Sequence, residues 1–524
     1  MKKLTLLLCF VSFLTKAQNI TVASGKSFTI EKTGSVTMSG NFSNSGTFTL
    51  NSDSDEFSSI IIGGTVAGNI SYNRYVNSAG TNEWDLIGAP VSGQSINSFV
   101  TANASTLATN GDTFAIGRYD NYGNEWINFT TAMLEGEILF PVGMGFQMAT
   151  ISGGTLKFTG APAATNKTQP IIDFSEGEGE GQLTTGTKWN LVANPFPSYI
   201  HGNTSADSSN NFLTINSEKL HDSYQAIYGY DADGIGSGYT VYNNTSAALR
   251  IAPGQAFMVA SDNPNVENPD VLSFTTAMRT TTGGDDFIAG RNSENSFELI
   301  LKLYEGDSEI DHTKFYFKEG LNLKLDPGYD AGHFNQQAAL TSRLVEEDEG
   351  VGFAINAMGL ESINDVVIPL VVNRESGNGF KISIHTNDIY EGTNVYLEDN
   401  QQGTMTLLNE QDFELTPQDN LSGAGRFFIH LTETVLSIDN KIETNYLNVF
   451  KADVNNFIIV EGTANQSNQI NLRLYNILGK EVVSKTLENN INTQTISTQG
   501  LATGIYVIKL KSGNTVLTKK LIIN

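Results

Sequence analysis

Residue types that carry most enzyme chemistry are sparse and scattered in this chain. The six histidines lie far apart, without a His-Glu-x-x-His motif or a closely spaced pair of the kind that binds zinc. No Gly-x-Ser-x-Gly turn occurs, and Gly25-Lys26-Ser27 lacks the upstream glycine of a phosphate-binding loop. The only cysteine is Cys9. The sequence therefore predicts no zinc site, no activated serine or cysteine nucleophile and no phosphate loop.

Acidic residues are the one chemically active type in large supply. The chain has 56 Asp and Glu against 31 Lys and Arg. Glycosidases use two carboxyl groups roughly 5 to 9.5 Å apart, a separation that a sequence does not reveal. We expect a protein that is not an enzyme, and a secreted polysaccharide hydrolase is the alternative.

One acidic segment begins like a calcium-binding loop. In Tyr230-Asp231-Ala232-Asp233-Gly234-Ile235 the two aspartates have the spacing of the first two ligands, but Ile235 stands at the third ligand position and no glutamate closes the loop. We interpret the segment as a turn. Asp231 and Asp233 are therefore only weak candidates for calcium ligands, and no other cofactor is predicted.

Aromatic residues stand beside polar ones in two predicted hairpins. The first contains Tyr119, Tyr122 and Trp126, and the second contains Tyr230 and Tyr239. Aromatic faces next to carboxylates and amides can bind sugar rings, so these five residues are candidate glycan-binding residues. Packing between strands accounts for the same composition, because aromatic side chains dominate strand pairing, and we favour this interpretation.

The two hairpins belong to an internal duplication. The segment Trp84–Pro90 (Trp-Asp-Leu-Ile-Gly-Ala-Pro) recurs at Trp189–Pro195 as Trp-Asn-Leu-Val-Ala-Asn-Pro, and three further blocks recur in the same order. We expect two similar β-units at residues 76–175 and 182–281, joined by an acidic Glu-Gly linker. Trp84 and Trp189 should occupy equivalent, mostly buried positions.

Strand patterns fill the rest of the chain. Residues 18–75 carry pairs of alternating apolar residues separated by glycines, which favours a β-solenoid, or else a meander that caps the next unit. Residues 296–432 contain short apolar runs typical of a β-sandwich. With 50 glycines, 29 Phe and 18 Tyr and few helical periodicities, the sequence predicts an all-β, multidomain protein.

Charge is divided unevenly along the chain. Residues 18–436 have a formal net charge of −31, and residues 437–524 have one of +3. An acidic body repels phosphate backbones, so nucleic acid is not an expected partner. The change of sign supports a domain boundary near Leu436.

The N-terminus has the pattern of a secretory signal peptide. Met1-Lys2-Lys3 is a basic start, Leu4–Leu14 is apolar, and Thr15-Lys16-Ala17 places small residues before a cut ahead of Gln18. Residues 1–17 are therefore predicted to be removed. No later segment approaches the ~20 apolar residues that span a bilayer, so we expect no transmembrane segment after this cleavage.

The last eighty residues predict a small antiparallel sandwich. Seven short strands at 446–451, 456–461, 470–476, 480–488, 493–497, 504–511 and 515–523 alternate with Asn, Gly and Ser. The strand around Ile505–Leu510 has one charged residue in six. We expect it to be a central strand with both faces largely covered.

Three blocks in this region carry a resemblance to a known family. They run from Leu472 to Val482, from Leu501 to Leu510 and from Lys519 to Ile523. Together they resemble the type A C-terminal sorting domain of the type IX secretion system, here at residues 437–524. The Tyr-Pro-Asn-Pro start of many members is replaced by Asn445-Tyr446-Leu447-Asn448. The signal residues within the blocks are Gly479, Lys480, Gly504, Tyr506, Lys519 and Lys520.

The resemblance implies a route and a partner. The protein should pass the inner membrane by the secretory pathway and the outer membrane by the type IX translocon, which recognises the sorting domain, and should be secreted or held at the cell surface. Such a domain is usually removed as its cargo is released or anchored. We expect an adhesin or binding protein, with an extracellular glycan or surface partner. A hydrolase and a structural surface-layer component are the alternatives.

Overall fold

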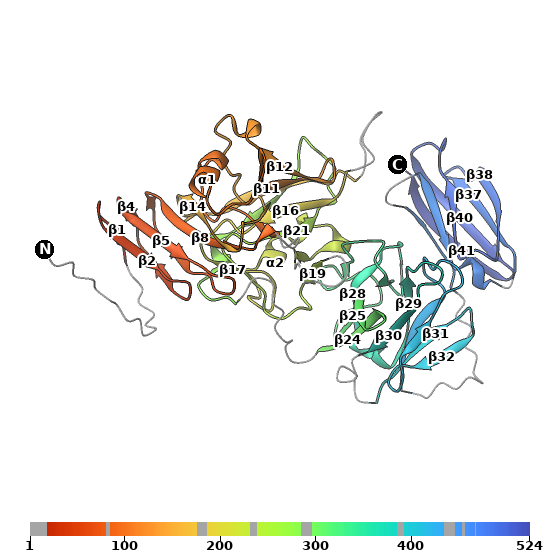
Figure 1. The fold of residues 1–524 in the computed structure, drawn as a ribbon. Coiled ribbons are helices and arrows are strands. Elements are labelled where there is room, and N and C mark those ends of the chain that lie inside the picture. Colours follow the sequence, from red (N-terminus) through yellow and green to blue (C-terminus); the bar gives the residue numbers. More distant parts are fainter. Residues whose placement is uncertain are drawn as a thin grey trace.

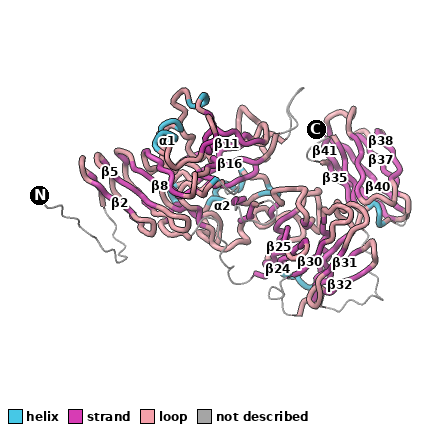
Figure 2. Tube along the Cα trace, viewed as in Figure 1, coloured by secondary structure: helices cyan, strands magenta, loops and turns pink. Residues whose placement is uncertain are grey.

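The computed structural model describes residues 18–79, 84–175, 186–230, 238–284, 296–384, 392–433, 446–452, 456–466 and 468–523. The predicted signal peptide lies outside these residues. Strands account for 49% of the structure and helices for 7%, which confirms the all-β class. The units follow one another in sequence order across the molecule (Figure 1), and the few helices are short (Figure 2). No helix in the described ranges is long and apolar enough to cross a membrane.

The first unit is a stack of parallel strands. Ile20 lies opposite Phe42 and Phe42 opposite Val66, so successive coils take 22 and 24 residues. Phe28 stacks on Phe48 of the next coil at 5.0 Å. Parallel stacking is that of a solenoid rather than of an antiparallel meander. The three sheets are β1 (Ile20–Val22), β4 (Phe42–Asn44) and β7 (Val66–Ala67); β2 (Ser27–Ile30), β5 (Thr47–Asn51) and β8 (Ile70–Val76); and β3 (Ser35–Met38) and β6 (Ser59–Ile62).

Strand β8 joins the solenoid to the units that follow. Its free edge pairs in antiparallel fashion with β14 (Gly154–Gly160) of the next unit. Arg74 of β8 is buried, its Nε donates to the carbonyl of Pro253 at 3.1 Å, and its guanidinium lies 4.0 Å from the ring centre of Phe57. The solenoid is thus packed against the two repeat units and is not merely tethered to them.

The next two units share one strand order. In the first, β11 pairs with β12 and β13, and β13 pairs with β9; in the second, β18 pairs with β19 and β21, and β21 pairs with β16. The register agrees as well: Phe146 lies opposite Ile87, and Phe257 opposite Val192. The strands are β9 (Asp85–Ile87), β10 (Thr109–Asn110), β11 (Thr113–Asp120), β12 (Glu125–Thr130), β13 (Phe146–Met148), β16 (Trp189–Ala193), β18 (Ile227–Tyr230), β19 (Tyr239–Tyr242) and β21 (Ala256–Ala260).

Each unit also has a short helix held by one asparagine. Asn103 follows α1 (Ile96–Ala102), and Asn216 ends α2 (Phe212–Asn216); both are buried. Each Nδ2 donates to the carbonyl four residues earlier at 2.9 Å and to a strand carbonyl at 3.1 Å, of Lys157 and Ser273 respectively. Each Oδ1 accepts the N–H of the same strand residue at 2.7 Å. The duplication therefore extends to individual hydrogen bonds.

The two units meet through reciprocal contacts. The N–H of Gly88 donates to Gly254 O at 2.7 Å, and the N–H of the equivalent Ala193 donates to Gly143 O at 2.8 Å. A Cβ on Gly88 would lie 2.3 Å from the Cβ of Ala193, so glycine is required there. The same pairs recur with the roles of the units exchanged, as an approximate two-fold axis demands.

The two repeat tryptophans differ in burial. Trp189 is buried, as expected, and it packs on Phe334 of the following unit at 4.4 Å. Trp84 is only half-buried. The expectation of equal burial fails because Phe334, which covers Trp189, comes from a part of the chain that is present once.

Five further strands pair around the units: β15 (Lys167–Ile171) with β22 (Asp270–Phe274), and β17 (Tyr199–His201) with β20 (Arg250–Ile251) and β23 (Arg279–Thr280).

The segment from 296 to 432 forms one continuous, nearly closed sheet of eleven strands. Its interior is aliphatic and aromatic, with Leu301, Phe317, Ile368 and Ile429 fully buried. One neighbouring pair, β25 and β28, is parallel. The strands are β24 (Ser296–Glu305), β25 (Ser308–Lys318), β26 (Ala331–Gly332), β27 (Leu340–Ser342), β28 (Phe353–Gly359), β29 (Asp365–Val372), β30 (Phe380–Ile384), β31 (Asn394–Asp399), β32 (Thr404–Leu407), β33 (Phe413–Leu415) and β34 (Phe427–Thr432).

Residues 446–523, the C-terminal sandwich, contain all seven predicted strands in two sheets. β40 is central, as expected, but only Tyr506, Ile508 and Leu510 on one face are buried, while Ile505 and Val507 face outward. The expectation of two covered faces is wrong because a two-sheet sandwich covers each strand on one side only. The sheets are β35 (Asn448–Lys451), β36 (Phe457–Glu461) and β39 (Thr493–Ser497); and β37 (Ile470–Asn476), β38 (Glu481–Leu487), β40 (Gly504–Ser512) and β41 (Thr515–Ile523).

Candidate functional site

A cleft of about 840 Å³ lies between the body, residues 18–433, and the C-terminal sandwich. Its body side comes from both repeat units and from the unit of the eleven-stranded sheet. Its other side comes from β35, β36 and β39. Its size is in the range typical of ligand sites. The charged, aromatic and amide side chains of its lining include Asn124, Lys188, Trp189, Phe334, Gln336, Gln337, Arg343, Asn373, Lys451, Phe457 and Glu461.

Aromatic rings form one wall of the cleft. Trp189 of β16 packs on Phe334 at 4.4 Å and on Tyr224 at 5.5 Å, and the ammonium of Lys188 lies 4.6 Å above the Tyr224 ring. Phe457 of β36 faces them from the sandwich with 40% of its surface exposed. Ring contacts of this kind hold the wall in one geometry.

Three of the five aromatic residues predicted from the sequence lie behind this wall, and a fourth, Trp126, packs on one of them. Tyr239 stacks on Phe334 at 4.0 Å, Tyr230 lies 5.3 Å from Tyr239, and Trp126 lies 5.2 Å from Tyr119. Tyr119, Tyr230 and Tyr239 pack against one apolar cluster that contains Trp189. Burial raises the pKa of the Tyr119 hydroxyl to about 12. Tyr119, Tyr230 and Tyr239 support the wall, Trp126 is 37% exposed, and none of the four lines the cleft.

Tyr122, the fifth, lies elsewhere. Its ring packs edge-on against Phe174 at 5.3 Å, and 43% of its surface is exposed. The turn that carries it still reaches the cleft through Asn124, which has a left-handed backbone with φ of 52°. Asparagine tolerates that conformation better than most residues. The Tyr119 hydroxyl donates to Asn124 Oδ1 at 2.6 Å, which fixes the amide at the rim.

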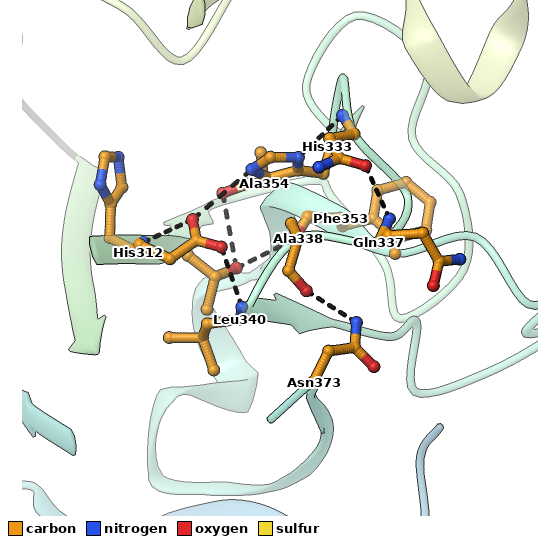
Figure 3. A network of polar contacts seen from close by, with 12 residues as sticks. His312, His333, Gln337, Ala338, Leu340, Phe353, Ala354 and Asn373 are labelled. Carbon is orange, nitrogen blue, oxygen red and sulfur yellow. Dashed lines mark hydrogen bonds and ion pairs between the residues drawn. The ribbon is translucent and has the colours of Figure 1, made fainter. Parts of the chain in front are cut away.

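Side-chain amides supply the polar part of the lining. The Gln336 Nε2 donates to His333 O at 2.7 Å, and its Oε1 accepts the N–H of Gly352 at 2.8 Å. The Asn373 side chain points to Ala338, to whose carbonyl it donates at 2.7 Å (Figure 3). The Gln337 side chain is exposed. Gln336 and Gln337 thus stand on a loop that hydrogen bonds hold in place, and one of these bonds comes from Asn373 at the end of β29.

A buried histidine and aspartate lie beneath that loop. His333 Nδ1 accepts the N–H of Asn335, and its Nε2 lies 3.6 Å from Asp311. The Asp311 carboxylate also accepts the N–H groups of His312 and Leu340 at 2.9 Å each, while the His312 ring points away from the network (Figure 3). The Thr313 hydroxyl donates to Phe353 O at 3.0 Å instead of facing the histidine. The pair has the residue types of a catalytic dyad, but its bonds fix the loop.

Two ion pairs join the body to the sandwich at the cleft: Lys519 with the exposed Glu349 at 3.0 Å, and the buried pair of Arg343 and Glu461. Nη2 of Arg343 lies 3.1 Å from Oε1 of Glu461, and both side chains are less than a tenth exposed. Nε and Nη1 of Arg343 and Oε2 of Glu461 have no hydrogen-bond partner. Burial raises the pKa of Glu461, and this is opposed by Arg343 and by the N–H of Ala424. The guanidinium thus uses one of its donors where a bidentate contact would use two.

Close backbone approaches accompany this ion pair. A Cβ on Gly350 would lie 2.2 Å from the Phe450 ring, and one on Gly425 would lie 2.9 Å from Gly462. Asn448 Nδ2 donates to the Asp348 carboxylate at 2.9 Å. The sandwich is therefore docked on the body through a fitted interface.

The predicted sorting residues occupy turns and strands of the sandwich. Gly479, with φ of 75°, and Lys480 lie in the β37–β38 turn, and the Tyr506 hydroxyl donates to Ala502 O at 2.7 Å. Lys519 reaches the body, where its Nζ donates to Asp348 O at 2.8 Å. The remaining two are Gly504, which begins β40, and the exposed Lys520 of β41.

The weak calcium candidates Asp231 and Asp233 lie outside the described residues. Within the described ranges, no three His, Cys, Asp or Glu side chains gather where they could hold a metal ion.

Comparison with known families gives two matches. Residues 10–431 match the model of a family described as Domain of unknown function (DUF8693). Residues 453–524 match the model of the Secretion system C-terminal sorting domain, which confirms the predicted sorting domain. No curated protein matches the chain. The second match gives the route: export by the type IX secretion system to the cell surface or beyond it.

Proposed function

We propose that this chain, which belongs to the family described as Domain of unknown function (DUF8693) and carries a sorting domain for export, is a surface or secreted glycan-binding protein of the adhesin type. The ligand would lie in the cleft between the body and the sorting domain. The family name carries no activity, so the proposal rests on the cleft.

One observation carries the proposal: the cleft combines aromatic rings with amide side chains on a rigid frame. Phe334 and Phe457 offer ring faces, and Asn124, Gln337 and Asn373 offer donors and acceptors at the rim. Sugars present apolar faces and hydroxyl edges, which such a lining complements. The hydrogen bonds beneath the loop already hold it in place, so less conformational entropy would be lost when a ligand binds.

A hydrolase is supported less well. The two carboxylates that line the cleft are Glu349 and Glu461. Glu461 is engaged with Arg343, and it belongs to the sorting domain rather than to the body. A glycosidase needs one carboxyl group free to transfer a proton to the leaving sugar.

The test is a glycan array with the full chain, followed by calorimetric titration of the hits. Phe457→Ala and Gln337→Ala should weaken binding about tenfold or more, equivalent to ~1.4 kcal/mol. Phe28→Ala, which removes a partly exposed ring from the solenoid, is the matched control and should leave binding unchanged.

Two results would contradict the cleft proposal. Absence of binding to any glycan would remove the function itself. Loss of binding in Tyr122→Ala or Trp126→Ala, without loss in the cleft variants, would move the site to the first hairpin. Shortened sugar products during the titration would favour the hydrolase.

A further inference from the structure

We propose that Arg343 is a carboxylate-recognition residue of the cleft, and that Glu461 of the sorting domain occupies it as an internal stand-in for a ligand carboxylate. The ligand class is therefore an acidic sugar of the uronic acid type. This rests on the proposed function in placing a glycan in the same cleft, and it adds the charge that the glycan carries.

Arg343 is built into the body as a fixed cation. Its backbone N–H donates to Pro369 O at 2.9 Å, and its carbonyl accepts from Asn356 Nδ2 at 2.7 Å. From the sandwich, the Phe450 ring lies 5.5 Å from the guanidinium carbon. The side chain is 8% exposed. A buried guanidinium needs a counter-charge, because removing a charge from water costs several kcal/mol.

Glu461 makes the direct ion pair with Arg343 and Asp348 adds a second negative charge nearby, but the hydrogen-bond donors of the guanidinium are only partly used. Glu461 contacts Nη2 alone, and the Nε and Nη1 donors face no acceptor. A carboxylate that entered along the guanidinium plane could accept two N–H groups side by side, which is the stronger arrangement. The sorting domain therefore fills the site with a contact that a free ligand could improve on.

The charges around the cleft fit an anionic ligand. Lys188, Arg343 and Lys451 line it against the two carboxylates Glu349 and Glu461, in a body whose net charge is −31. Without Glu461, Arg343 would still have Asp348 as a nearby negative charge, while Glu349 is paired with Lys519 at 3.0 Å, so cations would still outnumber acids around the cleft. Repulsion from the rest of the body is screened beyond ~8 Å at physiological salt and would slow association rather than prevent pairing inside the cleft.

Glu461 and a ligand carboxylate cannot both pair fully with Arg343. In the full chain the sorting domain would therefore act as an internal competitor, and binding of acidic sugar would be weak. Removal of the Glu461 carboxylate should free the site while the rest of the interface, including the Lys519 and Asn448 contacts, stays in place.

The experiment uses the full chain with Glu461→Ala, which leaves room for a small carboxylate beside Arg343. Sodium acetate should raise the melting midpoint of this variant by more than sodium chloride at equal ionic strength. Sodium glucuronate should do the same at lower concentration, and glucose should not. The wild-type chain should respond to acetate and chloride alike.

Two further variants keep the result interpretable. Arg343→Gln combined with Glu461→Ala should lose the difference between acetate and chloride. Glu481→Ala breaks an exposed ion pair with Arg473 in the same domain. Its melting midpoint should respond to acetate and chloride alike. If Glu461→Ala does not fold, Glu461→Gln serves instead, with glucuronate affinity expected about tenfold above that of the wild-type chain, or ~1.4 kcal/mol.

Equal responses of Glu461→Ala to acetate and chloride would overturn the proposal, as would an acetate effect that survives the loss of Arg343. If neutral glycans bind the cleft and glucuronate gains nothing from Glu461→Ala, this inference fails and the proposed function stands. If acetate acts as expected and no glycan binds any variant, the carboxylate site stands and the glycan function fails.

Discussion

Replacing Asn103 or Asn216 by alanine tests the duplication at the level of single hydrogen bonds. Each side chain makes three bonds, two to carbonyls and one to a strand N–H, at distances that agree between the units. Alanine would leave the N–H and carbonyl of the strand residue without this partner, at ~1–3 kcal/mol for each buried group. The helix carbonyl keeps a backbone donor, as Phe99 O keeps the N–H of Asn103 at 3.1 Å, so we expect a loss of about 2–4 kcal/mol in each unit from the two strand groups.

The assay is urea unfolding of the full chain, with near-ultraviolet circular dichroism as the signal. Both alanine variants should lower the midpoint of the body transition by similar amounts. Asn103→Asp should be at least as harmful, because it keeps the acceptor but sets a negative oxygen against two carbonyls. Asn97→Ala, on the exposed face of α1, is the control and should change the free energy of unfolding by less than about 0.5 kcal/mol. A loss below ~1 kcal/mol in either unit, or a loss in one unit only, would refute the equivalence.

Three further outcomes follow from the described contacts. Burial raises the pKa of Asp330 to about 8; the unfolded chain releases this proton near pH 4, so stability should fall between pH 4 and 8, by up to ~1.4 kcal/mol per pH unit. In Asp330→Asn this fall in the free energy of unfolding with pH should be absent. If urea unfolding at several pH values shows the same pH dependence in the variant, the raised pKa of Asp330 is contradicted. Trp189→Ala should cost about 3–5 kcal/mol, and a loss under ~1 kcal/mol in urea unfolding would mean that the wall repacks. The acidic body should melt at higher temperature in added salt, with sodium reproducing most of the effect of calcium; saturation at micromolar calcium would instead indicate a specific site.

Local patterns predicted the elements well. The C-terminal strands were predicted within one or two residues because the strands are short, the turns carry Asn and Gly, and apolar residues alternate. The duplicated units were visible because the Trp-x-Leu-x-x-x-Pro motif recurs. The same alternation misled at Ile505, where apolar residues stand on an exposed face.

Contacts between units were not predictable from the sequence. Arg343 and Glu461 are 118 residues apart and are flanked by no motif. Phe334 comes from the loop between β26 and β27, yet it stacks on Tyr239 of the second repeat. The Asp311–His333 pair joins a strand to a loop, and neither residue stands out among 56 acids and six histidines. Such pairings depend on how the units dock, which periodicity does not encode.

The approximate two-fold axis between the repeat units has an evolutionary consequence. A pair of units related in this way is what fusion of the two subunits of a homodimer would leave behind. In a homodimer, every substitution appears on both sides of the axis at once. Gly88 and Ala193 occupy equivalent positions that face each other, and there is room for one methyl group but not for two. Only a fused chain can hold glycine on one side and alanine on the other, so at this contact the two halves have become non-interchangeable.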